Sequence, residues 1–245
     1  MKAMIFAAGI GSRLKPWTDH HPKALVEIGD RPALWHVINR IKALGVSEMV
    51  INVHHFADQI ERYLSENNNF GVNIHVSDER SLLLDTGGGL LKAAEFLSGD
   101  EPIILHNADI FSNVSLAGLS ETHKKSGADA TLLVAQRKSS RGLLFDSGMR
   151  MHGWINVSTG ETIPSQIEGA ENLTPLAFGG IQIISPRILR SMSAKMKVEP
   201  FSIIPFYANN CEELNLMGYV APKQYYWYDV GKPETLEAAR QEIAG

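Results

Sequence analysis

Apolar residues follow two different spacings in the first half of the chain. Short apolar runs, several of them rich in β-branched residues, predict strands at residues 3–8, 48–53, 72–76, 102–105 and 130–135. Apolar positions at helical spacing predict helices between them, at residues 34–44, 57–64 and 116–126. Strands that alternate with helices predict an α/β fold: a Rossmann-like, mainly parallel sheet with helices on both faces.

The pattern changes after residue 135. From Arg137 to Asn172 the helical spacing fades, and short apolar pieces punctuated by Gly and Ser predict hairpins. Later strands are expected at residues 176–184, 216–220 and 225–228, and a closing helix follows them. The chain shows no internal repeat or low-complexity segment. We therefore predict one domain over residues 1–245, made of a first part (1–135), a strand-rich insert (136–220) and a closing strand and helix (221–245).

Composition narrows the class of protein. The chain has 245 residues, 44% of them hydrophobic, and a net charge of −4, which gives no overall attraction to nucleic acid or to anionic membrane. The single cysteine, Cys211, excludes an intrachain disulfide and a thiolate metal cluster. No apolar run approaches the length of a membrane span, and the N-terminal stretch is unlike a signal peptide. We expect a cytoplasmic protein.

A candidate phosphate-binding loop follows the first predicted strand. Gly9 and Gly11 allow backbone N–H groups to approach a ligand, while Arg13 and Lys23 supply positive charge nearby. The glycine pair alone could be a plain strand-to-helix turn, and the two cations favour phosphate. Leu14 occupies the place of the third glycine in a dinucleotide-binding loop, and the Walker A pattern is absent.

Three consecutive glycines, Gly87 to Gly89, open a predicted helix after Asp85 and Thr86. Glycine costs roughly 1 kcal/mol relative to alanine inside a helix, so another requirement must place it there. A flat base or ribose against bare backbone would be such a requirement, and a tight loop-to-helix junction is the alternative.

Two aspartates and a second glycine pair also stand in informative places. Asp109 follows a predicted buried strand, where a carboxylate can hold Mg²⁺ against phosphate, although it could equally be a turn or cap residue. Asp229 precedes the closing helix and could be only a turn residue. Gly179 and Gly180 lie inside a predicted strand, which indicates a bulge or a close ligand contact.

Together these segments resemble the sugar-1-phosphate nucleotidyltransferases. The matching elements are A-A-G-x-G-x-R at residues 7–13 with Pro16 and Pro22-Lys23, the D-T-G-G-G run at 85–89, and W-x-D-V-G-K-P-E at 227–234. The resemblance extends from Lys2 to about Gln241. It implies a GT-A-like fold in which the first part binds the nucleotide and the insert forms a small sugar-side lobe.

The resemblance also implies roles for individual residues. Catalysis is expected to depend on Arg13, Lys23 and Asp109. Nucleotide binding is expected at Ala8, Gly9, Gly11, Ser12, Arg13, Lys23, Asn52, Asp85, Thr86, Gly87 and Gly88. The sugar phosphate is expected at Asn107, Gly179 and Gly180. Mg²⁺ is expected at Asp109 and Asp229.

The implied reaction joins an NTP, UTP by preference, to a sugar 1-phosphate and releases pyrophosphate. Within the class the sequence looks most like N-acetylmuramate-1-phosphate uridylyltransferases, and guanylyl-, thymidylyl- and cytidylyltransferases share the frame. A nonenzymatic regulatory subunit is a further alternative, supported only by Ala108 and Ser202, where the family has Gly and, in some members, Lys. We expect a monomer or small homo-oligomer that binds neither nucleic acid nor membrane.

Overall fold

The computed structural model describes residues 1–222 and 224–244. Its strands are β1 (Lys2–Phe6), β2 (Glu27–Ile28), β3 (Arg31–Pro32), β4 (Glu48–Val53), β5 (Asn73–Asp78), β6 (Ile103–Asn107), β7 (Ile110–Ser112), β8 (Ala130–Ala135), β9 (Arg141–Phe145), β10 (Met151–Asn156), β11 (Thr162–Ile163), β12 (Thr174–Ile184), β13 (Leu216–Val220) and β14 (Trp227–Asp229). Its α-helices are α1 (Ala33–Lys42), α2 (Ala57–Glu66), α3 (Asp85–Lys92), α4 (Ala94–Leu97), α5 (Leu116–Ser126), α6 (Pro186–Lys195), α7 (Ile203–Asn209) and α8 (Pro233–Ala244). Short 3₁₀ turns include η1 (Ser12–Leu14) and η3 (Lys23–Leu25).

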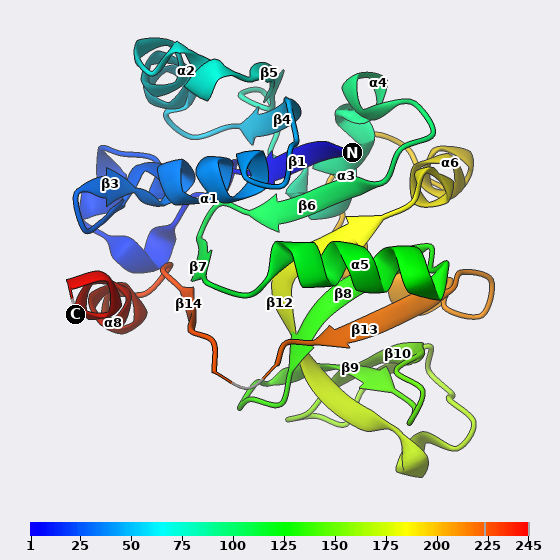
Figure 1. Ribbon diagram of the computed structural model, residues 1–245. Helices are drawn as coiled ribbons and strands as arrows, with labels where there is room; N and C mark the ends of the chain where they lie inside the picture. The colour runs from blue at the N-terminus through cyan, green and yellow to red at the C-terminus, as the bar shows by residue number, and fades with distance from the viewer. Residues whose placement is uncertain (223, 245) are drawn as a thin grey trace.

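A ten-stranded sheet runs through the molecule in the order β11-β10-β9-β12-β6-β1-β4-β5, and β8 also pairs with β12 and carries β13 on its other side (Figure 1). Strands β6, β1, β4 and β5 are parallel neighbours, and Met4 of β1 pairs with Val50 and Leu105. Strand β12 joins β6 in the antiparallel direction. The α/β class and the mainly parallel sheet predicted from the sequence are confirmed.

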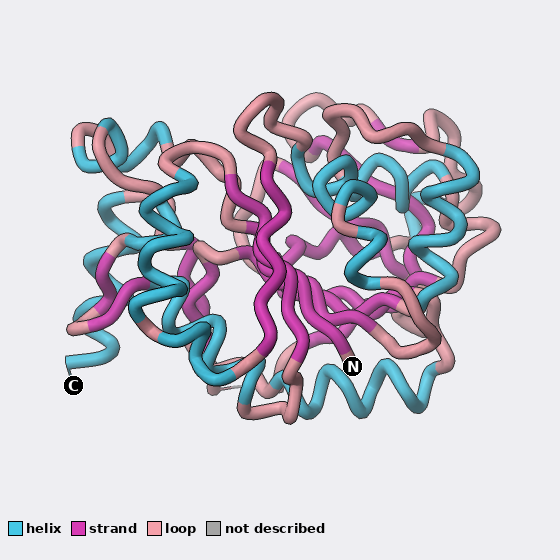
Figure 2. Tube along the Cα trace, turned by 90° about the horizontal axis from the view of Figure 1, so that it is seen from above, coloured by secondary structure: helices cyan, strands magenta, loops and turns pink. Residues whose placement is uncertain are grey.

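Helices cover both faces of the sheet because its central strands are apolar on both sides (Figure 2). Met4 of β1 faces a core completed by α3, α6 and α7, whereas its neighbours Ala3 and Ile5 face a second core completed by α1, α2 and α5. This alternation is the period-two geometry of a strand. Two cores therefore hold β1 fixed, and with it the loop that begins at its carboxyl end.

The strand-rich lobe predicted after residue 135 is present as the antiparallel strands β9, β10 and β11. It is continuous with the main sheet, because the first half of β12 pairs with β9 and its second half with β6. A register shift between Phe178 and Gln182 marks a bulge where the strand passes from one part to the other. The limits proposed for the three parts of the domain stay predictions.

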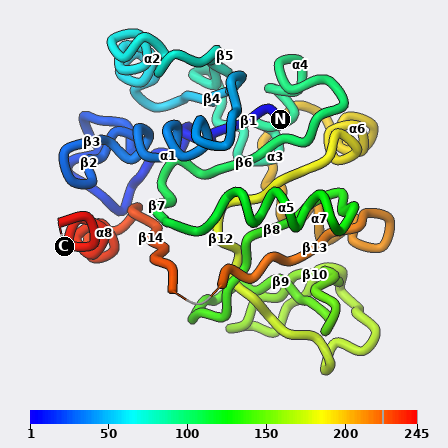
Figure 3. The backbone as a smooth tube through the Cα atoms, viewed as in Figure 1, coloured from blue at the N-terminus to red at the C-terminus, as the bar shows by residue number. Residues whose placement is uncertain are grey.

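The end of the chain packs against its beginning (Figure 3). Strand β14 pairs with β7 in the antiparallel direction, and α8 lies against β2 and β14. A small third core joins Leu14 and Val26 of the N-terminal part to Val230 and Leu236. None of the helices in the described part of the chain has the length and apolar character needed to cross a bilayer.

Candidate active site

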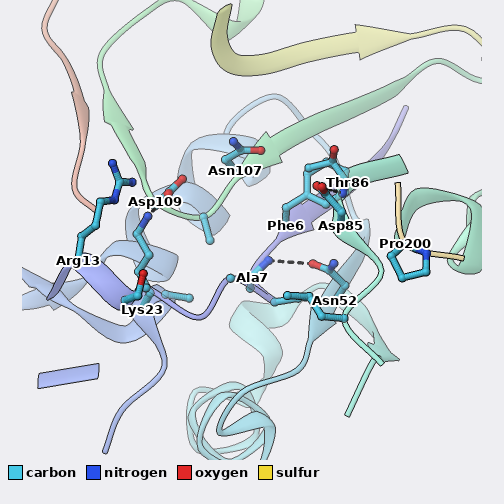
Figure 4. A pocket seen from close by; sticks show the side chains of 17 residues that line it. Phe6, Ala7, Arg13, Lys23, Asn52, Asp85, Thr86, Asn107, Asp109 and Pro200 are labelled. Atoms are coloured by element: carbon cyan, nitrogen blue, oxygen red, sulfur yellow. Dashed lines mark hydrogen bonds and ion pairs between the residues drawn. The ribbon is translucent and has the colours of Figure 1, made fainter. Parts of the chain in front are cut away.

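A cavity of about 540 Å³ opens at the carboxyl ends of β1 and β6, the edge at which open parallel sheets bind ligands. Its lining includes most of the residues predicted from the sequence: Ala8, Gly9, Gly11, Ser12, Arg13, Lys23, Asn52, Asp85, Thr86, Asn107 and Asp109. Five predicted residues lie outside the described lining: Gly87, Gly88, Gly179, Gly180 and Asp229. Figure 4 shows Arg13, Lys23 and Asp109 at one end of the cavity and Asp85, Thr86 and Pro200 at the other.

The loop after β1 presents unused hydrogen-bond donors. Within the described residues, no protein acceptor is in hydrogen-bonding range of the backbone N–H groups from Ala8 to Gly11. Gly11 has φ +69°, and a Cβ atom there would lie 2.8 Å from Cβ of Lys23, so glycine is required by both backbone and packing. Consecutive free N–H groups at a cavity wall form a site for phosphate oxygens.

Lys23 is the centre of a cluster of charges at this end of the cavity. The side chain is almost fully buried, and its ammonium group contacts Oδ2 of Asp109 and lies 3.7 Å from Oδ1 of Asp229. Arg13 approaches the other oxygen of Asp229 at 3.5 Å, but its side chain is half exposed, so this pair adds little stability. Two cations and two carboxylates thus meet beside the free N–H groups of the loop.

Asp109 and Asp229 each follow or end a strand predicted from the sequence, and the ends of parallel strands gather along one edge of a sheet, which predicts that the two residues meet. They do meet, but through a different arrangement: Asp229 pairs with Ile110 in the antiparallel ribbon of β7 and β14, and the Val230 N–H donates to the Asp109 carbonyl oxygen at 2.9 Å. The register of this ribbon, which the sequence did not reveal, places the carboxylates next to each other.

The two carboxylates fit a site for Mg²⁺. Oxygens of both approach one nitrogen of Lys23, so they converge on a common point. The described residues contain no cluster of three or more His, Cys, Asp or Glu side chains with metal-site geometry. Mg²⁺ does not need such a cluster, because it is commonly held by one or two carboxylates together with water and substrate phosphates.

The sequence analysis missed a buried hydrogen-bond network that supports the cavity. Asn52 accepts the Ala7 N–H at 2.8 Å and donates to Oε1 of Glu79 at 2.8 Å. The other oxygen of Glu79, which is fully buried, accepts the Leu84 N–H at 3.0 Å. The network therefore ties the end of β1 to the start of α3. Glu79 lies between Asp78 and Arg80, in a sequence typical of a solvated loop, so no local signal marks it.

The start of α3 has a different environment from the phosphate loop. The N–H groups of Gly87 and Gly88 donate to the Phe201 carbonyl oxygen at 2.8 and 3.2 Å. A Cβ atom at Gly87 would overlap the Phe201 ring, and one at Gly88 would overlap the Glu199 carbonyl oxygen. Tight packing against residues 199–201, rather than a base, explains why glycine is needed here. Contact of these two residues with a nucleotide stays a prediction.

Backbone geometry also shapes the region of the β12 bulge, where the sugar is expected to bind. Gly180 has φ +72° within the bulge of β12, and a Cβ atom there would lie 3.1 Å from the Asn107 amide. Asn107 lines the cavity, so the bulge lies next to it. The Trp227 indole donates to the Gly179 carbonyl oxygen at 2.9 Å, which joins the bulge to β14. Sugar contacts of Gly179 and Gly180 stay predictions.

Comparison with known proteins agrees with this geometry. The profile described as "Nucleotidyl transferase" matches residues 2–147, more than half of the chain. The N-acetylmuramate alpha-1-phosphate uridylyltransferase of Caulobacter vibrioides is 31% identical over 248 residues, covering 99% of this chain and 96% of that protein. The mannose-1-phosphate guanyltransferase of Schizosaccharomyces pombe is 28% identical over 96% of this chain but 62% of its own length.

Among solved structures, an apo UDP-glucose pyrophosphorylase superposes with a TM-score of 0.78 at 17% identity, covering 100% of this chain and 98% of that one. This likeness shows the fold, and the profile and the full-length relative show the ancestry. The chain belongs to the nucleotidyl transferase family.

Proposed function

We propose that this protein transfers a uridylyl group from UTP to a sugar 1-phosphate and releases pyrophosphate. The observation that carries the proposal is the junction of the free N–H groups from Ala8 to Gly11 with the charge cluster of Lys23, Asp109 and Asp229. Such a site binds a triphosphate and a cation side by side. Among the described residues that line the cavity, no nucleophile is paired with a base in the way that hydrolases use.

The chemistry requires positioning and charge neutralisation more than proton transfer. An oxygen of the sugar phosphate bonds to the α-phosphorus, the bond from that phosphorus to the bridging oxygen breaks, and pyrophosphate leaves with that oxygen. The acceptor is already ionised at neutral pH, so no general base is needed. Backbone N–H groups from Ala8 to Gly11, with Arg13 and Lys23, bind the triphosphate and stabilise charge on the leaving group.

Asp109 and Asp229 would hold Mg²⁺, which offsets negative charge on the phosphates. Until substrate binds, Lys23 neutralises these carboxylates, and it lines the cavity in which the phosphates would lie. The Asn52–Glu79 hydrogen bonds keep the Ala7 backbone in place both before and after substrate binds. Of the residues described, Lys23 therefore has the central role in both states.

A comparison of two relatives supports uridine among the bases. The uridylyltransferase relative matches this chain over nearly the full length of both proteins, whereas the guanyltransferase relative extends well beyond it. The uridylyltransferase relative acts on N-acetylmuramate α-1-phosphate according to its name, so we propose this compound as the acceptor. With these substrates we also propose a cytoplasmic location, where nucleoside triphosphates are available, and a monomer or small homo-oligomer.

Pyrophosphate release tests the proposal directly. The purified protein with Mg²⁺ is supplied with UTP, dTTP, CTP, GTP or ATP and with a set of sugar 1-phosphates. We expect UTP to give the highest kcat/KM, with N-acetylmuramate 1-phosphate as the best acceptor. The variants Asp109→Asn and Asp229→Asn, which keep shape but lose charge, should each lower kcat at least about 100-fold. A preference for a purine would overturn the uridylyl assignment, and no release with any pair would overturn the reaction.

A further inference from the structure

Arg137 is a half-buried cation that forms no ion pair with any residue the structure describes. It follows β8, where the main sheet gives way to the strand-rich lobe. Among the described residues, no carboxylate lies within 4.0 Å of its guanidinium, whereas Arg13 has one such partner and Lys23 has two. Burial lowers the pKa of Arg137 from its ordinary value, and nearby Tyr225 and Asp229 offset this only in part. A half-buried positive charge that has no paired carboxylate among the described residues is placed to bind an anion.

One carbonyl group and one aromatic ring hold this arginine in position. Arg137 Nη2 donates to the Phe178 carbonyl oxygen, and its guanidinium carbon lies 3.6 Å from the centre of the Trp227 ring. The Trp227 indole in turn donates to the Gly179 carbonyl oxygen at 2.9 Å. The bulge in β12 therefore orients both the cation and the aromatic face beneath it. A guanidinium has five N–H donors, and one hydrogen bond to the described protein leaves the others available.

The position of Arg137 relative to the charge cluster suggests what the anion is. Trp227 and Asp229 are two residues apart on β14, so their side chains point to the same side of the strand, roughly 7 Å from each other. Asp229 meets Arg13 and Lys23, and Arg137 lies over Trp227 farther along that side. Asp229 thus lies between Arg137 and the two cations proposed to bind the triphosphate, Arg13 and Lys23. An anion bound by Arg137 would therefore be held separately from the triphosphate, as the phosphate of the second substrate must be.

The geometry points to Arg137 as the residue that binds the phosphate group of the acceptor sugar 1-phosphate, an inference that rests on the proposed function. Guanidinium matches phosphate with two parallel hydrogen bonds, and it keeps its charge in a partly desolvated site. In this position it compensates the second phosphate that must enter a site already filled by a triphosphate. It is a binding residue for the acceptor and has no part in holding the nucleotide.

Kinetics of Arg137→Gln and Arg137→Lys test the assignment, with Lys138→Ala as the matched control because Lys138 is the exposed neighbouring cation. For Arg137→Gln we expect the KM of the acceptor to rise about 10- to 100-fold, the loss typical of one charged hydrogen-bonded contact, while the KM of the NTP changes less than about twofold. Arg137→Lys keeps the charge but not the pair of parallel N–H donors, so its KM for the acceptor should lie between those of the wild type and Arg137→Gln. Equal increases in both KM values, or a lower melting temperature with no selective effect on the acceptor, would overturn the assignment.

The nature of the acceptor's anion is tested with a matched pair. N-acetylmuramate 1-phosphate and N-acetylglucosamine 1-phosphate both carry the phosphate, and only the first carries a carboxylate. Arg137→Gln should raise the KM of both by a similar factor, and an increase confined to the first would reassign Arg137 to a carboxylate and overturn the phosphate assignment.

A binding measurement separates this inference from the proposed function. Calorimetric titration of the wild type and Arg137→Gln with N-acetylglucosamine 1-phosphate, with and without a non-hydrolysable UTP analogue and Mg²⁺, requires no turnover. Weaker binding to the variant supports the inference even if no product forms, whereas equal binding overturns it even if the enzyme is active.

Discussion

Two glycine-rich segments lie at or next to the cavity: Gly9 and Gly11 line it, and Gly87 to Gly89 follow directly after the lining residues Asp85 and Thr86. They differ in almost every physical respect. The first, Gly9 to Gly11, has no protein acceptor among the described residues for its N–H groups, and a Cβ atom at Gly9 would have no described atom within 4 Å. The second, Gly87 to Gly89, donates two N–H groups to Phe201, and added Cβ atoms there would overlap protein atoms. One segment is open toward a ligand, and the other is closed against its own chain.

The difference teaches that a run of glycines has no single meaning. Glycine at Gly9 leaves room for something that is not protein, whereas glycine at Gly87 and Gly88 allows residues 199–201 to pack closely. The direction of the N–H groups distinguishes the two cases, because every buried donor must find an acceptor. The comparison predicts that changes in the first segment affect catalysis and changes in the second affect stability.

The largest effect is expected at Lys23, which completes the open segment. Lys23→Met keeps the side-chain stem that packs against Gly11 but removes the ammonium group between Asp109 and Asp229. We expect kcat to fall about 10²- to 10³-fold, the usual cost of losing one group that stabilises transition-state charge. Steady-state kinetics measure the loss, and circular dichroism checks the fold.

Lys15→Ala is the matched control for this variant, since Lys15 is an exposed lysine paired with Asp19. It should alter kcat less than about twofold, as exposed ion pairs contribute little. A Lys23→Met enzyme with normal turnover and intact fold would contradict the role given to the open segment.

Much of this organisation follows from local sequence. The strand β4 and the helix α2 could be predicted because the spacing of their apolar residues is local information. The loop at Gly9 to Arg13 could also be predicted, because its glycines and its first cation are neighbours in the sequence. The family resemblance supplied Asp229, whose partner is far away along the chain.

The remaining features depend on contacts that no local pattern encodes. Thr86 accepts a hydrogen bond from Ile203, 117 positions later, and the packing that requires Gly87 and Gly88 lies in the same distant segment. Glu79 has a charged, loop-like sequence context and becomes structural only when Asn52 and Leu84 close around it. Arg137 acquires its position from a bulge in β12 and a ring in β14.

A smaller effect, on stability rather than on catalysis, is expected in the closed segment. In Gly88→Ala the new methyl group would overlap the Glu199 carbonyl oxygen, which is backbone and cannot rotate away. We expect the free energy of unfolding to fall by about 1–3 kcal/mol, the usual range for overpacking, with up to about 1 kcal/mol of helix propensity acting against it. Urea denaturation measures the change. An unchanged midpoint would show that the segment is not closed.

The smallest effect, and the most selective, is expected for Gly9→Ala. Gly9 lies outside the left-handed region and has open space where a Cβ atom would be, so the substitution should leave stability unchanged or raise it by about 0.4–1 kcal/mol through the unfolded chain. The methyl group would instead occupy cavity volume beside the free N–H groups, and the KM for the NTP should rise about tenfold, equivalent to about 1.4 kcal/mol. The KM for the acceptor should change much less, because the acceptor lies toward Arg137. Urea denaturation and initial rates on one preparation give both quantities. A destabilised Gly9→Ala protein would mean that the loop is packed like the start of α3, and an unchanged KM would mean that no ligand approaches Gly9.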